Sequence, residues 1–346
     1  MISREIWARL WELETTNRLN LVTAYLVLLA GTGSDHQLTK WSSTACEVYA
    51  GIGKPRAQHS IEELIRSGLI ARTDVSTRLM PQYRLPAVPL EEEPIFLPVQ
   101  LVTGLDRETP ILRRVRETGD GLLLRMLVDL YGLIQLDATH GIPLINLRRG
   151  AANGTQKIRE IGVHGVWGLS LGTSQNAQGD WVAPHRIKTK DPDSAWNVFW
   201  ERVALLKKIG AIWFEPWVFD GEDVDAEPLF PVDLGVFYSS SLDDEVAELT
   251  RLIHATSIKL LEDQPYLIDQ HSADLFLPLA AHRRPPALRG VARLRVEADT
   301  PGRRLSYAKR MSVLELGMAQ FGQLYNDAAA GNYARPISTA TQRLAG

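Results

Sequence analysis

The chain has 346 residues, 45% of them apolar and 23% charged, which is typical of a folded globular protein with two or three domains. Its single cysteine, Cys46, excludes an intramolecular disulfide and a cysteine-rich zinc site, and favours a reducing, cytoplasmic setting. Residues 1–13 are too charged for a signal peptide and the apolar run 21–30 is too short to cross a bilayer, so we expect no membrane association.

Two helices are predicted before residue 31. Residues 3–16 place apolar side chains on one helical stripe, namely Ile6, Trp7, Leu10, Trp11 and Leu13. We interpret this stripe as packing on its own domain, with a dimer contact as the alternative. Asn17 or Asn20 is expected to cap the next helix, whose apolar run 21–30 forms a core and ends at Gly31.

Residues 39–86 have the pattern helix, tight turn, helix, two-stranded hairpin. A hydroxyl within 42–44 is expected to cap the first helix, and Thr44 with Glu47 has capping-box spacing. Gly51 and Gly53 break this helix, because glycine tolerates the positive φ of a sharp turn.

The second helix of this segment is amphipathic. Pro55 suits its first turn and Gly68 ends it. Its predicted inner face consists of Ala57, Ile61, Leu64 and Ile65. Its predicted outer residues are Lys54, Arg56, Gln58, His59, Glu63 and Arg66. Two strands, 69–72 and 82–85, are then expected to flank a polar tip at 73–77.

The run YAGIGKPRAQHSIEELIRSGLI resembles the recognition-helix segment of winged helix-turn-helix DNA-binding proteins, including GntR-like regulators and plasmid or phage replication initiators. The resemblance covers residues 17–86 and implies that the second helix, 54–67, enters the major groove. It departs from the family at Gly53, where many members carry a serine or threonine that caps the helix and touches phosphate. The DNA-contacting residues expected on this basis are Ser43, Lys54, Arg56, Gln58, His59, Arg66, Arg72, Arg78 and Arg84.

Different roles are expected within this set. Arg56, Gln58 and His59 are placed to read base edges. Phosphate contacts are expected from Lys54, Arg72, Arg78 and Arg84. Because a single module buries little surface on DNA, we expect a homodimer on a palindromic or repeated site.

A proline- and acid-rich passage predicts a boundary between a first domain, 1–90, and a linker, 91–104. Beyond it, the predicted helix 192–209 and strands 211–219 and 228–232 repeat the order seen at 55–85. We therefore predict a second winged-helix-like unit at 105–240. Its would-be wing tip is acidic, which favours a packed core or a protein partner over DNA.

The C-terminal region is predicted to be helical with a basic hairpin. A strand-like run occupies 164–172, and a helix is expected at 242–261. Two strands, 292–297 and 304–308, are expected to form the hairpin of this region, 241–330, before a final helix at 312–328. The polar tail 331–346 is expected to be flexible.

Charges are sorted into blocks along the chain. Residues 148–190 carry seven basic against two acidic side chains, and residues 283–310 carry nine against two. Residues 220–248 carry ten acidic side chains and no lysine or arginine. The secondary basic site comprises Arg283, Arg284, Arg289, Arg293, Arg295, Arg303 and Arg304. These arginines are expected either to follow a phosphate backbone or to pair with the acidic block.

Motifs for catalysis are not found: the sequence has no HExxH, no GxSxG and no Cys/His cluster. We therefore expect no enzyme, no cofactor and no metal. The predicted fold class is α+β, mainly α with small β-hairpin wings and a C-terminal α/β region. The predicted function is sequence-specific binding of double-stranded DNA, by a transcription regulator or a replication initiator of a mobile element. The alternative is a non-enzymatic adaptor subunit, which the ten basic and eight acidic residues of 1–86 permit.

Overall fold

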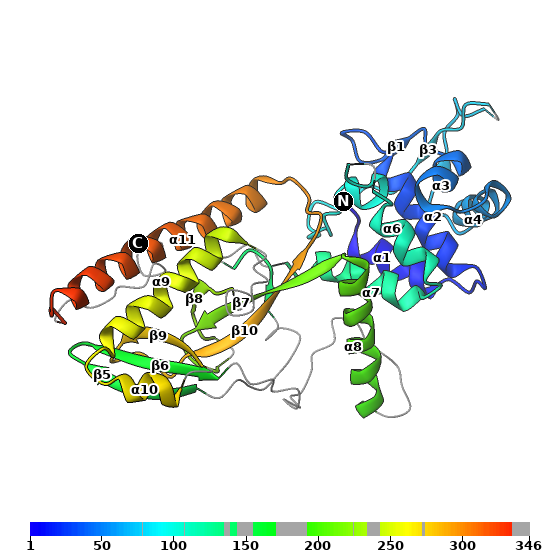
Figure 1. Ribbon diagram of the computed structural model, residues 1–346. Coiled ribbons are helices and arrows are strands. Elements are labelled where there is room, and N and C mark those ends of the chain that lie inside the picture. The colour runs from blue at the N-terminus through cyan, green and yellow to red at the C-terminus, as the bar shows by residue number, and fades with distance from the viewer. Residues whose placement is uncertain are drawn as a thin grey trace. The chain divides into compact units, whose positions relative to one another are not determined.

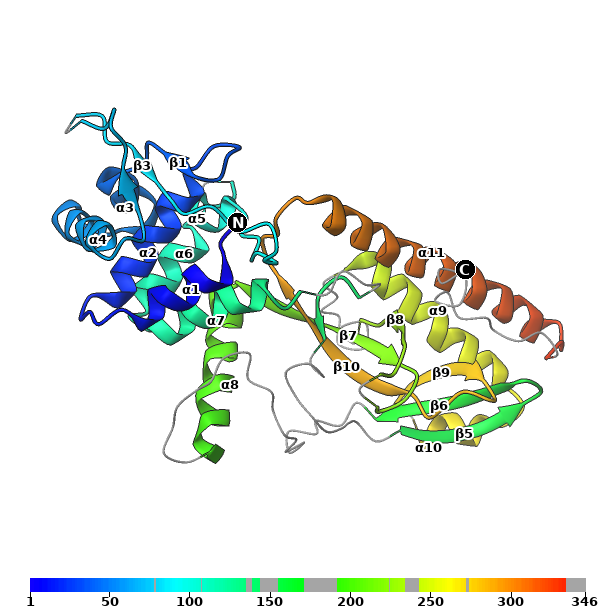
Figure 2. The same ribbon diagram turned by 180° about the vertical axis from the view of Figure 1, so that it is seen from behind.

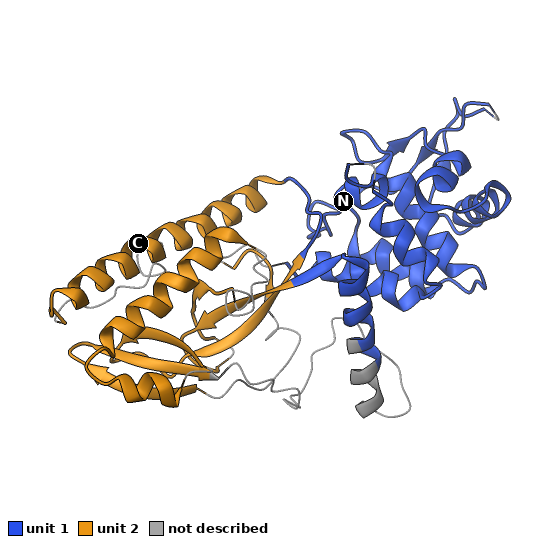
Figure 3. Cartoon of the chain, in the orientation of Figure 1, with its two compact units in different colours: residues 1–134, 184–213, 294–299 blue, residues 135–183, 214–293, 300–346 orange. Residues whose placement is uncertain are grey.

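The computed structural model describes residues 1–77, 79–106, 108–134, 139–143, 155–170, 192–223, 225–233, 243–271 and 274–333. The fold is mixed, with helices and small antiparallel sheets, as the predicted α+β class requires. The chain forms two compact units (Figure 3). Unit 1 comprises 1–134, 184–213 and 294–299, and unit 2 comprises 135–183, 214–293 and 300–346.

Unit 1 is mainly helical (Figure 1). Its helices are α1 (Arg4–Glu12), α2 (Arg18–Ala30), α3 (Ser43–Ala50), α4 (Lys54–Arg66), α5 (Gln100–Thr103), α6 (Ile111–Glu117), α7 (Gly121–Tyr131) and α8 (Pro192–Ile209). Three short strands, β1 (Leu38–Thr39), β2 (Ala71–Arg72) and β3 (Tyr83–Arg84), form an antiparallel sheet in the order β1-β3-β2.

Helix α2 is the centre of this unit. Every residue from 21 to 29 is buried, because the helix is apolar on all sides and is surrounded by its neighbours. Helices α3, α4 and α6 all pack against it. The expected core helix at 21–30 is therefore confirmed, with Asn17 at its N-cap position and Gly31 at its end.

The expected linker is part of unit 1. The carboxylate of Glu92 accepts a hydrogen bond of 2.6 Å from the Ser3 hydroxyl, and Ile95 bridges to Ile2 through the backbone. Helix α5 then packs against α2, α3 and α6. The expected boundary at residue 90 and linker at 91–104 are corrected accordingly. Proline favours an extended chain here, but Glu92 and Ile95 bond to residues near the N-terminus, so the passage belongs to unit 1.

Unit 2 contains two sheets and two long helices. Strands β5 (Thr155–Ile161), β6 (His164–Ser170) and β9 (Asp274–Ala280) form one antiparallel sheet. The other has the order β4 (Ile142–Pro143), β10 (Ala287–Leu294), β7 (Ile212–Phe219) and β8 (Pro228–Pro231). Its helices are α9 (Asp244–Leu260), α10 (Pro265–Gln270) and α11 (Pro301–Ala329). Helices α9 and α11 lie side by side, and α9 packs against β9 (Figures 1 and 2).

The hairpin expected at 292–308 is wrong. Residues 304–308 lie in α11, which begins at Pro301 after the Thr300 hydroxyl accepts a hydrogen bond from the Arg303 backbone N–H. The turn-like Thr-Pro-Gly sequence is thus a helix start, with proline in the first turn. The buried positions continue at three- and four-residue spacing to Ala328, which is the pattern of one long helix.

The expected second winged-helix-like unit is also corrected. Its helix and strands form where they were predicted, as α8, β7 and β8. Helix α8, however, packs on α6 and α7 in unit 1, whereas β7 from residue 214 and β8 belong to unit 2 and extend its four-stranded sheet. The order of helix and strands along the sequence is repeated, but the way in which these elements pack is not. Among the described helices, none is long and apolar enough to cross a membrane.

Candidate nucleic-acid interface

Helix α4 has one buried face and one exposed face, as its amphipathic pattern predicts. Ala57, Ile61 and Leu64 are fully or almost fully buried against unit 1. Away from this face, six polar side chains are exposed to solvent: Lys54, Arg56, Gln58, His59, Glu62 and Arg66. The first turns of the helix thus present polar and basic groups outward from a fixed apolar base.

The turn before α4 sets the position of its first residues. Gly51 ends α3 in the left-handed region, with φ of 66°, and its backbone N–H closes the helix on Glu47. Ile52 is 1% exposed and anchors the turn in the core. Gly53 has an ordinary φ of −55° and occupies the N-cap position of α4 without a side chain to cap it. Only the first glycine needs the conformational freedom that we expected of both.

The start of α3 differs in detail from its prediction. Ser42 is the N-cap residue and its side chain makes no capping hydrogen bond, so Thr44 lies inside the helix rather than in a capping box with Glu47. Ser43 is the first residue of α3 and is half-buried. It therefore lies at the opposite end of α3 from the turn at 51–53, and it is not part of the exposed face of α4.

A polar network that sequence reasoning missed joins α2 to α4. The Asn17 amide donates a hydrogen bond of 2.9 Å to the hydroxyl of Ser60, which is fully buried on the inner face of α4. Asn20 donates in turn to Asn17 at 2.7 Å. Because buried polar atoms need partners, this network fixes the rotation of α4 on α2. In the sequence, this contact is indicated by the position of Ser60 on the otherwise apolar face of the helix.

The exposed face of α4 carries side chains without internal partners. Within the described residues, the side chains of Arg56, Gln58, His59 and Arg66 form no hydrogen bond or ion pair. Lys54 forms an exposed pair with Glu47 at 3.5 Å, a contact of small energetic value. By contrast, arginines elsewhere in unit 1, such as Arg114 and Arg202, bind carboxylates.

The hairpin formed by β2 and β3 carries two more of the predicted arginines. Arg72 and Arg84 are both exposed. The register pairs Arg72 with Tyr83 and Arg84 with Ala71, which places the two guanidinium groups on opposite faces of the hairpin. They therefore do not form a single patch. Arg78 lies outside the described residues.

The loop between β2 and β3 is more apolar than expected. Beyond the predicted polar tip at 73–77, Leu79 and Met80 are 92% and 74% exposed, and Val75 is 73% exposed. The adjacent Leu79-Met80 pair in the sequence was a visible signal, and the strand prediction passed over it.

Three arginines of the secondary basic site bind the acidic loop after β7. Arg283 forms ion pairs with Asp220 at 2.7 Å and with Glu227 at 3.1 Å. Arg284 pairs with Asp223 at 3.0 Å. Arg289 donates to the carbonyl oxygens of Gly221 and Asp223 and lies over the ring of Phe219. Of the two expected alternatives, these three arginines therefore follow the second, in which they pair with the acidic block at 220–248.

The remaining four arginines are dispersed. Arg295 is in unit 1, where it bonds the carboxylate of Glu108 at 2.7 Å. Arg293 and Arg303 are buried in unit 2, and Arg304 is exposed on α11. The seven residues thus do not gather on one surface of either unit.

Arg293 belongs to a buried ionic cluster around Glu215. The Glu215 carboxylate binds the guanidinium groups of Arg293 and Arg310 and accepts from the Trp217 indole at 2.6 Å. Arg310 also binds Asp243 at 3.0 Å. Burial acts to raise the pKa of Glu215, but the two arginines overcome it and hold that pKa below its ordinary value. The cluster links β7, β10 and α11 within unit 2.

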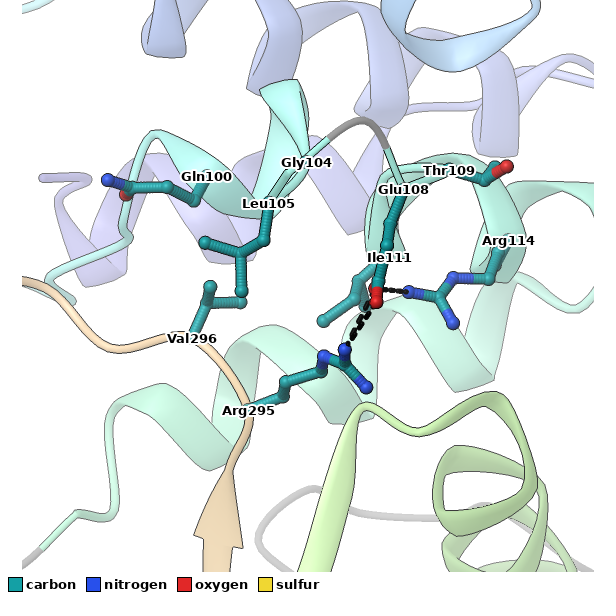
Figure 4. Close-up of a pocket in the computed structure, with 9 residues that line it drawn as sticks. All are labelled: Gln100, Gly104, Leu105, Glu108, Thr109, Ile111, Arg114, Arg295 and Val296. Carbon is teal, nitrogen blue, oxygen red and sulfur yellow. Dashed lines mark hydrogen bonds and ion pairs between the residues drawn. The ribbon is translucent and has the colours of Figure 1, made fainter.

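A small cavity occurs in unit 1 where residues 294–299 return to it. Glu108 lies between Arg114 and Arg295 there, with Leu105, Ile111 and Val296 supplying apolar walls (Figure 4). Its volume is about 10 Å³, which accommodates roughly one water molecule. The cavity is thus part of an ion-paired contact within unit 1 and is too small for an organic ligand.

Comparison with known proteins returns no match: no family model, no curated protein and no solved structure is similar to this chain. Among the described residues, no group of three or more His, Cys, Asp or Glu side chains is placed to hold a metal ion.

Proposed function

We propose that this protein binds double-stranded DNA sequence-specifically, with residues 17–86 acting as a winged helix-turn-helix and α4 entering the major groove. The observation that carries the proposal is the outer face of α4. There, Arg56, Gln58 and His59 project into solvent without an internal partner. Their helix is held rigidly on a buried core by Ala57, Ile61 and Leu64.

The topology around α4 supports this assignment. Helices α3 and α4 are joined by the short turn at 51–53, and both pack on α2. The following hairpin pairs with β1 in the order β1-β3-β2. This succession of a core helix, a helix pair and a hairpin is the one that the resemblance to winged helix-turn-helix proteins implies. In helix-turn-helix proteins the second helix of the pair reads the major groove.

The chemistry of the exposed residues suits base and phosphate recognition. An arginine such as Arg56 can bind guanine bidentately, and the amide of Gln58 can bind adenine. The cations Lys54, Arg72 and Arg84 are available for phosphates. We assign His59 to base edges and Ser43 to a phosphate beside the first turn of α3. Arg66 lies on the same helix face as His59 and is also assigned to DNA contact.

We propose binding rather than catalysis as the activity, in a transcription regulator or a replication initiator of a mobile element. A homodimer is proposed because a single module covers only a short half-site. Dimeric binding predicts a recovered sequence with two similar half-sites, centred one helical turn or a multiple of it apart.

The test is selection of bound sequences from random double-stranded DNA by the purified full chain, at two salt concentrations. A recovered motif bound about a thousandfold or more tightly than bulk DNA supports the proposal. Salt-sensitive binding without a motif contradicts sequence-specific reading and indicates contact with the phosphate backbone only. Absence of binding contradicts the proposal altogether and favours the adaptor alternative.

A further inference from the structure

The loop between β2 and β3 exposes a cluster of apolar side chains that the proposed base reading by α4 does not use. Val75, Leu79 and Met80 are each more than 70% exposed. In two opposite views, the chain between β2 and β3 projects beyond the helices of unit 1 (Figures 1 and 2). Exposed apolar residues that occur singly need no explanation, but a cluster at the end of a projecting hairpin does.

The loop holds these side chains outward by its own hydrogen bonds. The backbone N–H of Thr73 donates to Gln82 at 3.1 Å, and their side chains bond at 2.8 Å. Closer to the end, the Thr77 N–H donates to the carbonyl of Met80 at 3.1 Å. The Met80 N–H returns a bond of 3.0 Å to the Thr77 hydroxyl. This bonding favours a loop that does not collapse onto the core.

The charges around the apolar cluster indicate what it contacts. Residues 71–84 contain three arginines and one carboxylate, Asp74. Arg72 and Arg84 lie on opposite faces of the hairpin, and neither forms an ion pair in the described part of the chain. Either groove of DNA has a phosphate row on each side, and guanidinium groups on both faces of an inserted hairpin would meet both rows. The apolar side chains favour the minor groove, because that is where proteins insert apolar wedges between base steps.

We propose that Leu79 and Met80 insert into the DNA minor groove as an apolar wedge that unstacks a base step and bends the duplex. Leucine and methionine are among the side chains that act as such wedges, with bends of roughly 20–90°. The inference rests on the proposed function, since the same module must already be seated on DNA through α4. It adds a deformation of the DNA, and hence a preference for flexible base steps beside the α4 half-site.

The test compares the full chain with the double variant Leu79→Ala/Met80→Ala on a selected site. Leu90→Ala is the matched control, because Leu90 is a fully exposed leucine of the same unit outside the hairpin. DNA bending is measured by gel mobility with the site permuted along the fragment. Base unstacking is measured by the fluorescence of 2-aminopurine placed at successive steps beside the half-site.

Wild-type protein and Leu90→Ala are expected to bend the site and raise 2-aminopurine fluorescence at one step. The double variant is expected to lose both signals and about tenfold to a hundredfold in affinity, while recovering the same α4-contacted bases in a selection. Equal bending and affinity in all three proteins would overturn the wedge and leave the proposed function standing. Loss of self-association without a change in bending would also overturn it, and would assign the cluster to a second copy of the chain. No DNA binding by wild-type protein would overturn both proposals.

Discussion

The side-chain amide of Asn17 and the buried hydroxyl of Ser60 form a hydrogen bond of 2.9 Å that joins the start of α2 to the inner face of α4. The bond lies one residue from His59, which is exposed on the outer face of the same helix. A polar contact in the core thus sets the direction of the face that we propose reads DNA.

Removing this hydrogen bond should destabilise unit 1. Ser60→Ala leaves the Asn17 amide without its acceptor and should lower the free energy of unfolding by about 1–3 kcal/mol. Denaturant unfolding measures the loss, and Ser34→Ala, at an exposed serine, is the control. A double-mutant cycle with Asn17→Ala should show a coupling of about 0.5 kcal/mol or more. Additive effects would mean that the two groups do not interact.

The two glycines of the turn should respond differently to substitution. At Gly51, φ is positive and an added Cβ would lie 3.1 Å from Nε of Arg113. Gly51→Ala should therefore cost about 1–2 kcal/mol of stability. At Gly53, φ is ordinary and no atom lies within 4 Å, so Gly53→Ser should gain a few tenths of a kcal/mol as a helix cap. Thermal unfolding of both variants checks this, and equal effects would contradict the turn geometry.

Breaking the buried ionic cluster should strongly destabilise unit 2. Glu215→Gln removes the carboxylate that binds the buried guanidinium groups of Arg293 and Arg310, and Arg310 keeps its ion pair with Asp243. The expected loss is about 3–5 kcal/mol at neutral pH. Glu248→Gln, on the exposed side of α9, should change stability by less than about 0.5 kcal/mol. Comparable values for both variants would show that the cluster is solvated.

The same cluster predicts the direction of pH dependence. Because the pKa of Glu215 is lower in the folded protein than its ordinary value of 4.5, the unfolded chain binds more protons in that range. The stabilisation that the ionised Glu215 carboxylate contributes is complete at a pH above its ordinary pKa. It is lost as the pH falls through the lowered pKa of the folded protein. The stability difference between wild type and Glu215→Gln should therefore shrink below about pH 4.5. A difference that grows on acidification would contradict this sign.

The single cysteine should be unreactive in the folded protein. Cys46 is buried, and burial raises the pKa of its thiol to about 12. A thiol reagent at pH 8 should modify the native chain at least about a hundredfold more slowly than the denatured chain. Because Cys46 is the only thiol, the comparison needs no variant. Rapid modification of the native chain would show that α3 opens.

Local elements were well predicted where the sequence contains its own stop signals. Helix α8 has the predicted bounds because Pro192 suits a first turn and Gly210 adopts a positive φ after Ile209. The buried positions Ala57, Ile61 and Leu64 of α4 also follow from spacing, since apolar residues at three- and four-residue intervals share one side of a helix. Ile65, predicted on the inner face, and Glu63, predicted on the outer face, are both half-buried.

Errors arose where one local pattern fits two structures. The Thr300-Pro301 pair suits both a turn and a helix start, and only the long-range burial of α11 decides between them. The predicted domain boundaries differ from the two units of the structure because each unit is assembled from three separate segments of chain. The pairing of Arg283 with Asp220 and the contact of Asn17 with Ser60 bridge 63 and 43 residues, which periodicity cannot detect.

The most direct test of base reading by α4 is a selection from random DNA repeated with Arg56→Ala. Arg9→Ala, at an exposed arginine of α1, is the matched control. Arg56→Ala should cost about 1–3 kcal/mol on the wild-type site and relax specificity at one base pair of each half-site, with the other positions unchanged. Uniform weakening on all sequences, or a motif identical to that of wild type, would contradict the claim that α4 reads base edges.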